Sequence, residues 1–300
     1  MSRTARITIA ALAMVLGAAG AVAAQEATVD STFIWKRALA VDLTATQTAY
    51  SDSWTGGEAG AFSWVGNAAG FAERNLNPWF NLRSQVKLSF GQTTTQDEET
   101  KDWSKPKKST DLIDWETVGR FLLNQYVDPY AAFRLESQFY DGSNAKKKLY
   151  LSPLKLTESA GLAHRFYEKS NDHITTRLGG AYRQIITRFI ADTVTLATDS
   201  RTVSDAGLES VTDAVLTLSE KMQYTGKLTL FKALYNSEDD ALGADDDWKA
   251  VDVRWENAVT AQVSKIIAVS FLFDLRYDKE IVDKAQIKET LGLGFLFKLI

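Results

Sequence analysis

Side chains suited to nucleophilic or metal chemistry are scarce in this chain of 300 residues. It contains no cysteine and only two histidines, His164 and His173. Without cysteine there are no disulfides, thiolate metal sites or cysteine nucleophiles, and two histidines cannot build an imidazole-rich metal cage. The sequence therefore predicts no catalytic residues, no cofactor and no dedicated metal site.

Carboxylates cluster most densely from Glu238 to Asp247, where two acidic triplets flank Ala241 to Ala244. Divalent cations such as calcium prefer clustered carboxylates as ligands. The segment lacks the alternating oxygens, central glycine and terminal glutamate of a calcium-binding EF-hand loop. A solvated loop is therefore the favoured interpretation, and divalent cation binding stays open as the alternative.

Many of the other charged side chains recur at every second position, opposite apolar ones. From Phe80 to Gly91, for example, Arg83 and Lys87 alternate with apolar residues. A period of two indicates β-strands with one polar and one apolar face. If the polar faces line an interior, it contains twelve candidate residues: Arg83, Lys87, Arg120, Arg134, Glu136, Arg177, Arg183, Asp252, Arg254, Glu256, Asp274 and Arg276.

A long series of strands must position these side chains. The alternation predicts twelve, at residues 35–51, 60–74, 78–94, 112–126, 130–141, 154–168, 173–189, 211–223, 227–236, 249–263, 265–277 and 287–300. Short turns such as Tyr224 to Gly226 alternate with long links such as Ala191 to Ser210 and Asp278 to Gln286. This pattern is typical of outer-membrane barrels. We therefore expect an all-β fold, a transmembrane antiparallel up-and-down β-barrel of about twelve strands with short periplasmic turns and long extracellular loops.

A soluble β-sandwich or lipocalin-like barrel would also alternate, with its apolar face inward. Three features favour the membrane barrel. Most predicted strands reach the ~9–11 residues that a tilted membrane strand needs. Aromatic residues such as Phe80, Phe90 and Tyr277 fall at strand ends on the apolar face, where a membrane barrel has its aromatic girdles. The interior charges would each cost several kcal/mol in a dry core, whereas a wet lumen with paired charges avoids that cost.

Residues 1–24 have the layout of a secretory signal peptide. Arg3 and Arg6 precede the apolar run from Ile7 to Gly17, and small residues follow it. We therefore expect export, a short periplasmic segment at 25–34 and a barrel at 35–300 in the bacterial outer membrane. Its expected surroundings are outer-membrane lipid and lipopolysaccharide. The formal net charge of -4 argues against nucleic acid as a partner.

The segment from Thr290 to Phe297 reads Thr-Leu-Gly-Leu-Gly-Phe-Leu-Phe. It is similar to the C-terminal β-signal by which the outer-membrane assembly machinery recognises its clients. The chain departs from the commonest form by ending Lys298-Leu299-Ile300 instead of on an aromatic residue. The resemblance implies that the assembly machinery is a partner through Thr290 to Phe297.

Most of the mature chain resembles a domain-of-unknown-function family of bacterial outer-membrane β-barrel proteins of the Bacteroidetes type. The matching features are Gln47, Ser53-Trp54, Gly56-Gly57, Leu151-Ser152-Pro153, Lys227 to Phe231, Trp255-Glu256 and Leu275 to Asp278. Ser53 stands where the family commonly has asparagine. The resemblance implies a location and an architecture but no activity.

Two functions stay open. The first is a channel or binding barrel for a small hydrophilic solute of unknown identity, with a preference for anions because eight of the twelve candidate residues are cationic. The second is a closed structural or interaction barrel, plugged by the same charges and without transport or enzymatic activity. Twelve strands enclose a modest lumen, so an open lumen and a lumen plugged by side chains are both feasible.

An outer-membrane hydrolase is disfavoured. The segment around His164 lacks the His-x-Ser-Asn-Gly run of outer-membrane phospholipases, and His173 falls in a predicted periplasmic turn. Six lysines fall in the predicted outer loops: Lys105, Lys107, Lys108, Lys146, Lys147 and Lys148. Contact with the anionic lipopolysaccharide surface and plain solubility both explain them.

Overall fold

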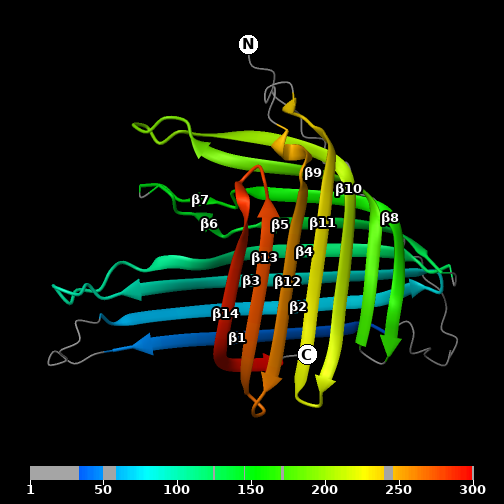
Figure 1. Cartoon of the computed structure of the whole chain (residues 1–300), viewed down its shortest axis with the longest axis horizontal. Helices are drawn as coiled ribbons and strands as arrows, with labels where there is room; N and C mark the ends of the chain where they lie inside the picture. Colours follow the sequence, from blue (N-terminus) through cyan, green and yellow to red (C-terminus); the bar gives the residue numbers. More distant parts are fainter. Residues whose placement is uncertain are drawn as a thin grey trace, which may run out of the picture. The chain divides into compact units, whose positions relative to one another are not determined.

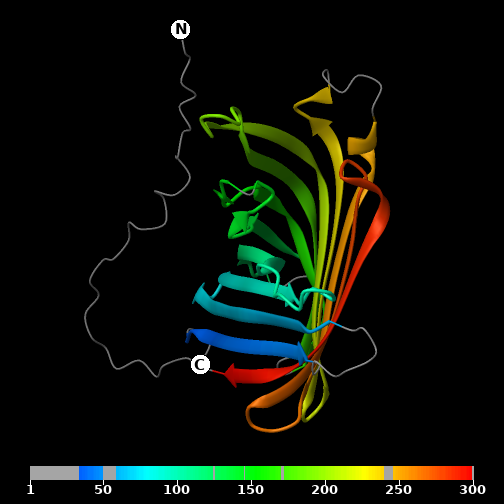
Figure 2. The ribbon, with the colours of Figure 1, turned by 90° about the vertical axis from the view of Figure 1, so that its left-hand side faces the viewer.

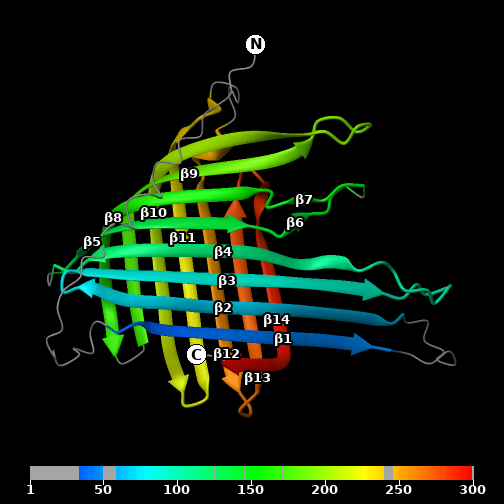
Figure 3. The ribbon, with the colours of Figure 1, turned by 180° about the vertical axis from the view of Figure 1, so that it is seen from behind.

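Twelve antiparallel strands close into a barrel (Figures 1 and 3). The strands of the barrel are β1 (Lys36–Thr48), β2 (Ala61–Asn77), β3 (Phe80–Thr95), β4 (Lys107–Phe121), β5 (Asp128–Ser137), β8 (Leu154–Lys169), β9 (Asp172–Ile190), β10 (Thr198–Ser219), β11 (Met222–Asn236), β12 (Val251–Gln262), β13 (Ile267–Asp278) and β14 (Val282–Lys298). β1 pairs with β14, with Thr44 opposite Gly294, so the sheet has no free edge. The all-β fold, the antiparallel up-and-down order and the number of strands are therefore confirmed.

The computed structural model describes residues 34–49, 59–123, 126–144, 146–169, 172–239 and 246–298. The predicted signal peptide at 1–24 and residues 25–33 of the predicted periplasmic segment lie outside the described residues, as do Ser53-Trp54 and Gly56-Gly57. In the part that is described, no helix is long and apolar enough to cross a membrane.

Two small elements are not part of the barrel sheet. β6 (Tyr140–Asp141) and β7 (Leu149–Tyr150) form a separate two-stranded sheet in the link between β5 and β8. The 3-10 turn η2 (Asp247–Lys249) precedes β12, and its Trp248 is buried. Both elements lie in links at the long-loop end of the barrel, so they extend the wall beyond the ends of its strands.

Several predicted strand boundaries are wrong, although the strand count is right. Residues 198–210, predicted as part of a long link, form the first part of β10 and pair with β9. The turn before β11 lies at residues 220–221 rather than at Tyr224 to Gly226, and only residues 279–281 join β13 to β14. The polar composition of residues 198–210 lacks clear alternation, which explains why the sequence reads there as a loop.

Alternate side chains of each strand lie on opposite faces of the wall. On β4, Asp114 and Glu116 are 4% exposed whereas Trp115 between them is 41% exposed. On β9, Arg177 is buried and the next residue, Leu178, is 60% exposed. Polar and charged residues therefore lie inside and large apolar residues outside, the reverse of a soluble β-barrel.

The strands of opposite walls cross when the barrel is seen from the side. In Figure 1, β1 to β5 run horizontally and β11 to β14 run vertically. Figure 2 shows these two walls facing each other. Strands in closed barrels tilt by roughly 35–45° from the barrel axis, so front and back walls slope in opposite directions.

Glycines allow very close contacts between neighbouring strands from β8 to β11. A Cβ atom at Gly179 would lie 2.2 Å from the carbonyl oxygen of Ala160, and one at Gly207 would lie 2.1 Å from that of Lys232. Real Cβ atoms cannot approach backbone so closely, so these two positions accept only glycine without rearrangement. The backbones of neighbouring strands therefore lie very close together at Gly179 and Gly207.

Candidate functional site

Glu116 on β4 is the centre of the first group of interior ion pairs. Its carboxylate lies 2.7 Å from Arg177 Nη2 on β9 and 2.7 Å from Lys227 Nζ on β11. Gln85 Nε2 on β3 donates a third hydrogen bond of 2.7 Å. All three charged side chains are only 4–5% exposed. Because β4 and β11 are five strands apart in the ring of twelve, the contact with Lys227 joins nearly opposite walls.

Arg134 on β5 belongs to a second group that is continuous along the interior. It donates to both carboxylate oxygens of Asp114, at 3.2 and 2.7 Å, and lies 3.2 Å from Glu136. Glu136 also pairs with Arg254 on β12, which bonds Glu256 at 3.0 Å. β5 and β12 are again five strands apart, so this group also crosses the interior.

Two lysines extend the second group. Lys155 on β8 lies 3.8 Å from Glu136, and Lys87 on β3 lies 4.0 Å from Glu256. The Lys87 side chain is 42% exposed, which marks the boundary between the filled part of the interior and space that water reaches.

Arg183 on β9 holds the third group. Its guanidinium pairs with Asp205 on β10 at 3.0 Å and with Asp252 on β12 at 2.5 Å. The same guanidinium lies 3.8 Å from the centre of the Phe231 ring, so a cation–π contact adds to the ion pairs. Asp205 is 1% exposed and is among the most deeply buried side chains of the described residues.

The energetics of these groups require that they stay paired. Removing a charge from water costs several kcal/mol, and this cost is recovered only when the partners and remaining hydrogen bonds are in place. Bidentate contacts such as that of Arg134 with Asp114 meet this condition. Glu116, Arg134 and Arg183 are accordingly buried within the barrel interior, each in contact with its ion-pair partners.

The remaining predicted candidates lie nearer the ends of the interior. Arg83 pairs with Glu73 at 2.7 Å, and Arg120 lies 3.7 Å from Asp128 close to the short-turn end. Arg276 pairs with Asp274 at 2.6 Å and is half exposed. The structure thus brings seven of the twelve candidates into the buried parts of the three groups, and Lys87 lies at the exposed edge of the second group. The seven are Arg134, Glu136, Arg177, Arg183, Asp252, Arg254 and Glu256.

Sequence reasoning missed several buried partners. Asp114 and Glu116 occupy the same face of β4 as the predicted Arg120, and counting every charged residue on that face would have found them. Lys227 and Asp205 were missed because the strand boundaries around them were wrong. Three of these four added partners are acidic, so the cationic excess behind the expected anion preference is smaller than the twelve candidates alone indicated.

Small polar side chains line another part of the interior wall. Ser63 and Thr93 are 2.8 Å apart across β2 and β3, and Asn67 Nδ2 donates to Asp42 on β1 at 2.9 Å. Ser89 Oγ donates to Asn67, which continues the row onto β3. These residues lie on β1, β2 and β3.

The two histidines take no part in the interior groups. His164 lies beside Phe166, with ring centroids 4.5 Å apart, and its Nδ1 contacts the carbonyl oxygen of Tyr126. His173 opens the paired part of β9 opposite Val215. The predicted absence of catalysis stays a prediction.

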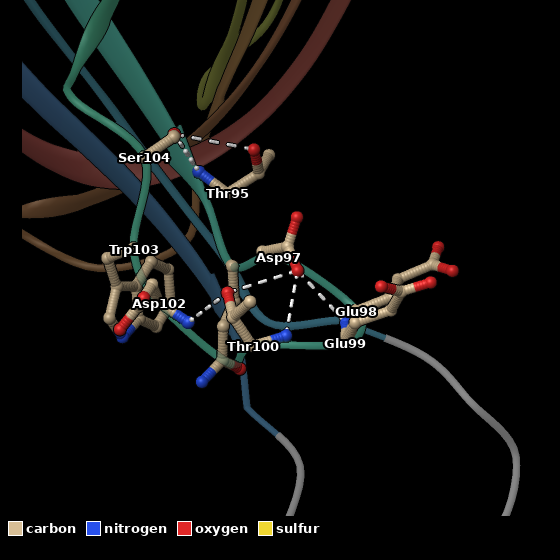
Figure 4. A pocket seen from close by; sticks show the side chains of 9 residues that line it. Thr95, Asp97, Glu98, Glu99, Thr100, Asp102, Trp103 and Ser104 are labelled. Carbon is tan, nitrogen blue, oxygen red and sulfur yellow. Dashed lines mark hydrogen bonds between the residues drawn. The ribbon is translucent and has the colours of Figure 1, made fainter.

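Two acidic segments lie in links at the long-loop end. Within the described part of the chain, no group of three or more carboxylates and histidines could hold a metal ion. Residues 240–245 of the acidic segment Glu238 to Asp247 are outside it, so calcium binding there stays untested. A shallow hollow is lined by residues of the 95–104 segment. Figure 4 shows these residues, among which Asp97 accepts hydrogen bonds from the amides of Glu99 and Thr100. These bonds build the turn and occupy the carboxylate.

Comparison with known proteins bears on the family and the fold. Residues 45–142 match the model of a family described as "Protein of unknown function (DUF3078)", which confirms the expected resemblance to a family of unknown function. Its Bacteroidetes type stays a prediction. No curated protein matches the chain.

Among solved structures, the chain is similar to an outer membrane channel from Pseudomonas putida F1, with 14% identity and a TM-score of 0.43 over 88% of this chain and 94% of that one. It is also similar to the translocator domain of the autotransporter NalP from Neisseria meningitidis, with 10% identity and a TM-score of 0.39 over 90% of each chain. These similarities describe the fold alone.

Proposed function

We propose that the protein is a barrel of the bacterial outer membrane whose interior is closed by ion pairs between opposite walls, and that it acts as a non-enzymatic structural or interaction component of the envelope. The observation that carries this proposal is the contact of Lys227 with Glu116, two buried side chains from nearly opposite strands. An open porin needs a continuous water path through the barrel. The contact of Lys227 with Glu116 lies across the interior, where such a path would have to run.

The outer face of the barrel supports the location in a membrane. Six leucines on five of the strands are more than half exposed: Leu162, Leu178, Leu208, Leu234, Leu291 and Leu293. A contiguous apolar surface of this extent is rare on soluble monomers, whereas lipid covers it in a membrane barrel. Trp79 and Phe121 stack near the short-turn end, with their ring planes 7° apart, as expected for a membrane-interface girdle.

Liposome swelling tests the closed interior. Purified protein refolded into liposomes is expected to exclude small sugars, because the ion pairs block passage. The double variant Glu116→Ala/Lys227→Ala removes the contact across the interior and is expected to admit them. The matched control is Arg201→Ala/Glu238→Ala, which removes an ion pair at the long-loop end in which Arg201 is exposed. Rapid swelling with the unmodified protein would overturn the proposal.

A second candidate function is a narrow conduit for a small hydrophilic solute beside the ion pairs. The row of Ser63, Asn67 and Ser89 favours it, since small polar side chains leave room and offer hydrogen bonds. If the unmodified protein admits solutes, Asn67→Trp should reduce uptake whereas Glu116→Ala/Lys227→Ala should leave this path in place. That pair of results would favour the conduit over the closed barrel.

A further inference from the structure

The small sheet of β6 and β7 carries an aromatic and cationic cluster at the long-loop end. Tyr140 pairs with Tyr150, and their ring centroids are 6.4 Å apart. Lys148 Nζ lies 4.2 Å from the centre of the Tyr140 ring, and Arg188 Nη1 on β9 lies 3.5 Å from the carbonyl oxygen of Tyr150. Lys148, Tyr150 and Arg188 are all exposed, so two cations and a phenol are available to a ligand.

Lys108 on β4 anchors this cluster to the barrel. Its Nζ donates to the carbonyl oxygen of Tyr140 at 2.5 Å, to Gln138 at 2.7 Å and to Asp111 at 2.8 Å. Asp111 in turn accepts hydrogen bonds from the amides of Phe139 and Tyr140. The hairpin is therefore held in place before any ligand arrives, and the charge of Asp111 is already compensated by Lys108.

The cluster lies on the outer side of the wall. Phe90, which shares the apolar outward face of β3, is 6.0 Å from the Tyr140 ring and 5.8 Å from the Phe139 ring. Arg188 lies on the same face of β9 as the exposed residues Leu178 and Tyr182, because even numbers of positions separate the three. The two cations therefore lie above an apolar, lipid-facing surface rather than over the interior.

Alternation within the hairpin keeps negative charge away from this face. Tyr150 of β7 and Lys148, which precedes β7, are exposed, whereas Leu149 between them is buried. Asp141 is paired with Leu149, so it belongs to the face of Leu149, where it bonds the amide and hydroxyl of Ser143. The exposed face of the hairpin is thus aromatic and cationic.

On the basis of the proposed outer-membrane location, we propose that Lys148 and Arg188 bind the phosphate groups of lipopolysaccharide, through its lipid A, while Tyr140 and Tyr150 pack at the boundary of its acyl chains. Guanidinium and ammonium groups are the usual partners of phosphate, and aromatic rings prefer the interface between headgroup and acyl chain. Cations directly above an apolar wall match a phosphorylated lipid better than they match a free anion.

Lipid binding by purified full-length protein in detergent tests this site. Titration with bis-phosphorylated lipid A, followed by native mass spectrometry, is expected to show a retained lipid that fully dephosphorylated lipid A does not replace. Lys148→Ala/Arg188→Ala is expected to weaken lipid A binding by about tenfold or more, since two charge-assisted contacts are lost. Lys105→Ala, which removes another exposed lysine at the same end of the barrel, should leave the affinity unchanged.

Three results would overturn the lipid site. They are equal binding of phosphorylated and dephosphorylated lipid A, an affinity that Lys148→Ala/Arg188→Ala leaves unchanged, and displacement of lipid A by inorganic phosphate at comparable concentration. Heat-modifiable migration in detergent gels reports on barrel folding separately. A folded barrel recovered in the outer-membrane fraction without lipid A binding would contradict this site alone, whereas recovery in the soluble fraction would contradict the proposed location.

Discussion

Lys227 on β11 donates to Glu116 on β4 at 2.7 Å, and this contact joins nearly opposite walls of a twelve-stranded barrel. Arg177 occupies the other carboxylate oxygen of Glu116. One carboxylate thus connects three strands that are not neighbours in the sheet. The proposed closure of the barrel interior depends on this group of ion pairs.

Replacing Glu116 by glutamine should destabilise the barrel strongly. The variant Glu116→Gln leaves the charges of Arg177 and Lys227 buried without their shared partner, and breaking such a buried pair typically costs about 3–5 kcal/mol. Urea unfolding followed by tryptophan fluorescence in lipid vesicles measures the loss. Arg201→Ala at the long-loop end is the control and should change the free energy of unfolding little, because Arg201 is exposed to solvent. Equal effects would show that Glu116 is not structurally coupled across the interior.

Two adjacent glycines should respond differently to the same substitution. A Cβ at Gly179 would lie 2.2 Å from a backbone oxygen of β8, whereas a Cβ at Gly180 would meet nothing closer than 4.0 Å. Gly179→Ala should therefore cost about 1–3 kcal/mol of unfolding free energy, and Gly180→Ala should be nearly neutral. Parallel urea titrations of the two variants check this. A neutral Gly179→Ala would mean that β8 and β9 do not approach so closely.

The turn between β13 and β14 should make stability depend on pH. Although Glu280 as a residue is exposed, partial burial of its carboxyl raises the pKa to about 7, and the carboxylates of Asp205 and Asp278 add to the rise. The folded state therefore binds the proton of Glu280 more tightly than the unfolded state does. The contribution of Glu280 to the stability of the folded protein is fully present below pH 4.5, the ordinary pKa of the group, and is lost as the pH rises to about 7. Unfolding midpoints at pH 5 and pH 8 should differ less in Glu280→Gln than in the unmodified protein. Glu98→Gln in the 96–106 link is the control, and an identical difference in all three proteins would refute the role of Glu280.

Lipid-facing and interior positions of β4 should tolerate opposite substitutions. Trp115→Arg places a charge toward lipid and should lower stability by roughly 2–4 kcal/mol near the middle of the membrane. Trp115→Leu keeps the face apolar and should cost much less. Refolding yield into lipid vesicles and urea unfolding of both variants measure this difference, and similar losses would argue that Trp115 does not face lipid.

Much of the fold could be predicted from the sequence because one period dominates it. In β3, Arg83 and Lys87 fall on one face and Leu82 and Val86 on the other, which is sufficient to assign a strand and its two environments. The prediction failed where polarity outweighed alternation, as in the first part of β10. There the pairing with β9 supplies the stability that apolar residues supply elsewhere.

The interior was harder to predict than the wall. Alternation shows that Glu116 faces inward, but it does not show that Lys227, more than a hundred residues later, meets it. That contact depends on the order of strands around the ring, which is a property of the closed barrel. The acidic partners Asp114, Glu116 and Asp205 were likewise absent from the predicted interior residues.

Single-channel recording in planar bilayers tests the central claim most directly. If the contact of Glu116 with Lys227 closes the barrel, the unmodified protein should give no steady current above the bare-membrane baseline at neutral pH. Glu116→Ala/Lys227→Ala should then give stable open steps, and Arg201→Ala/Glu238→Ala should give none. A steady open current of porin size from the unmodified protein would contradict the closed interior.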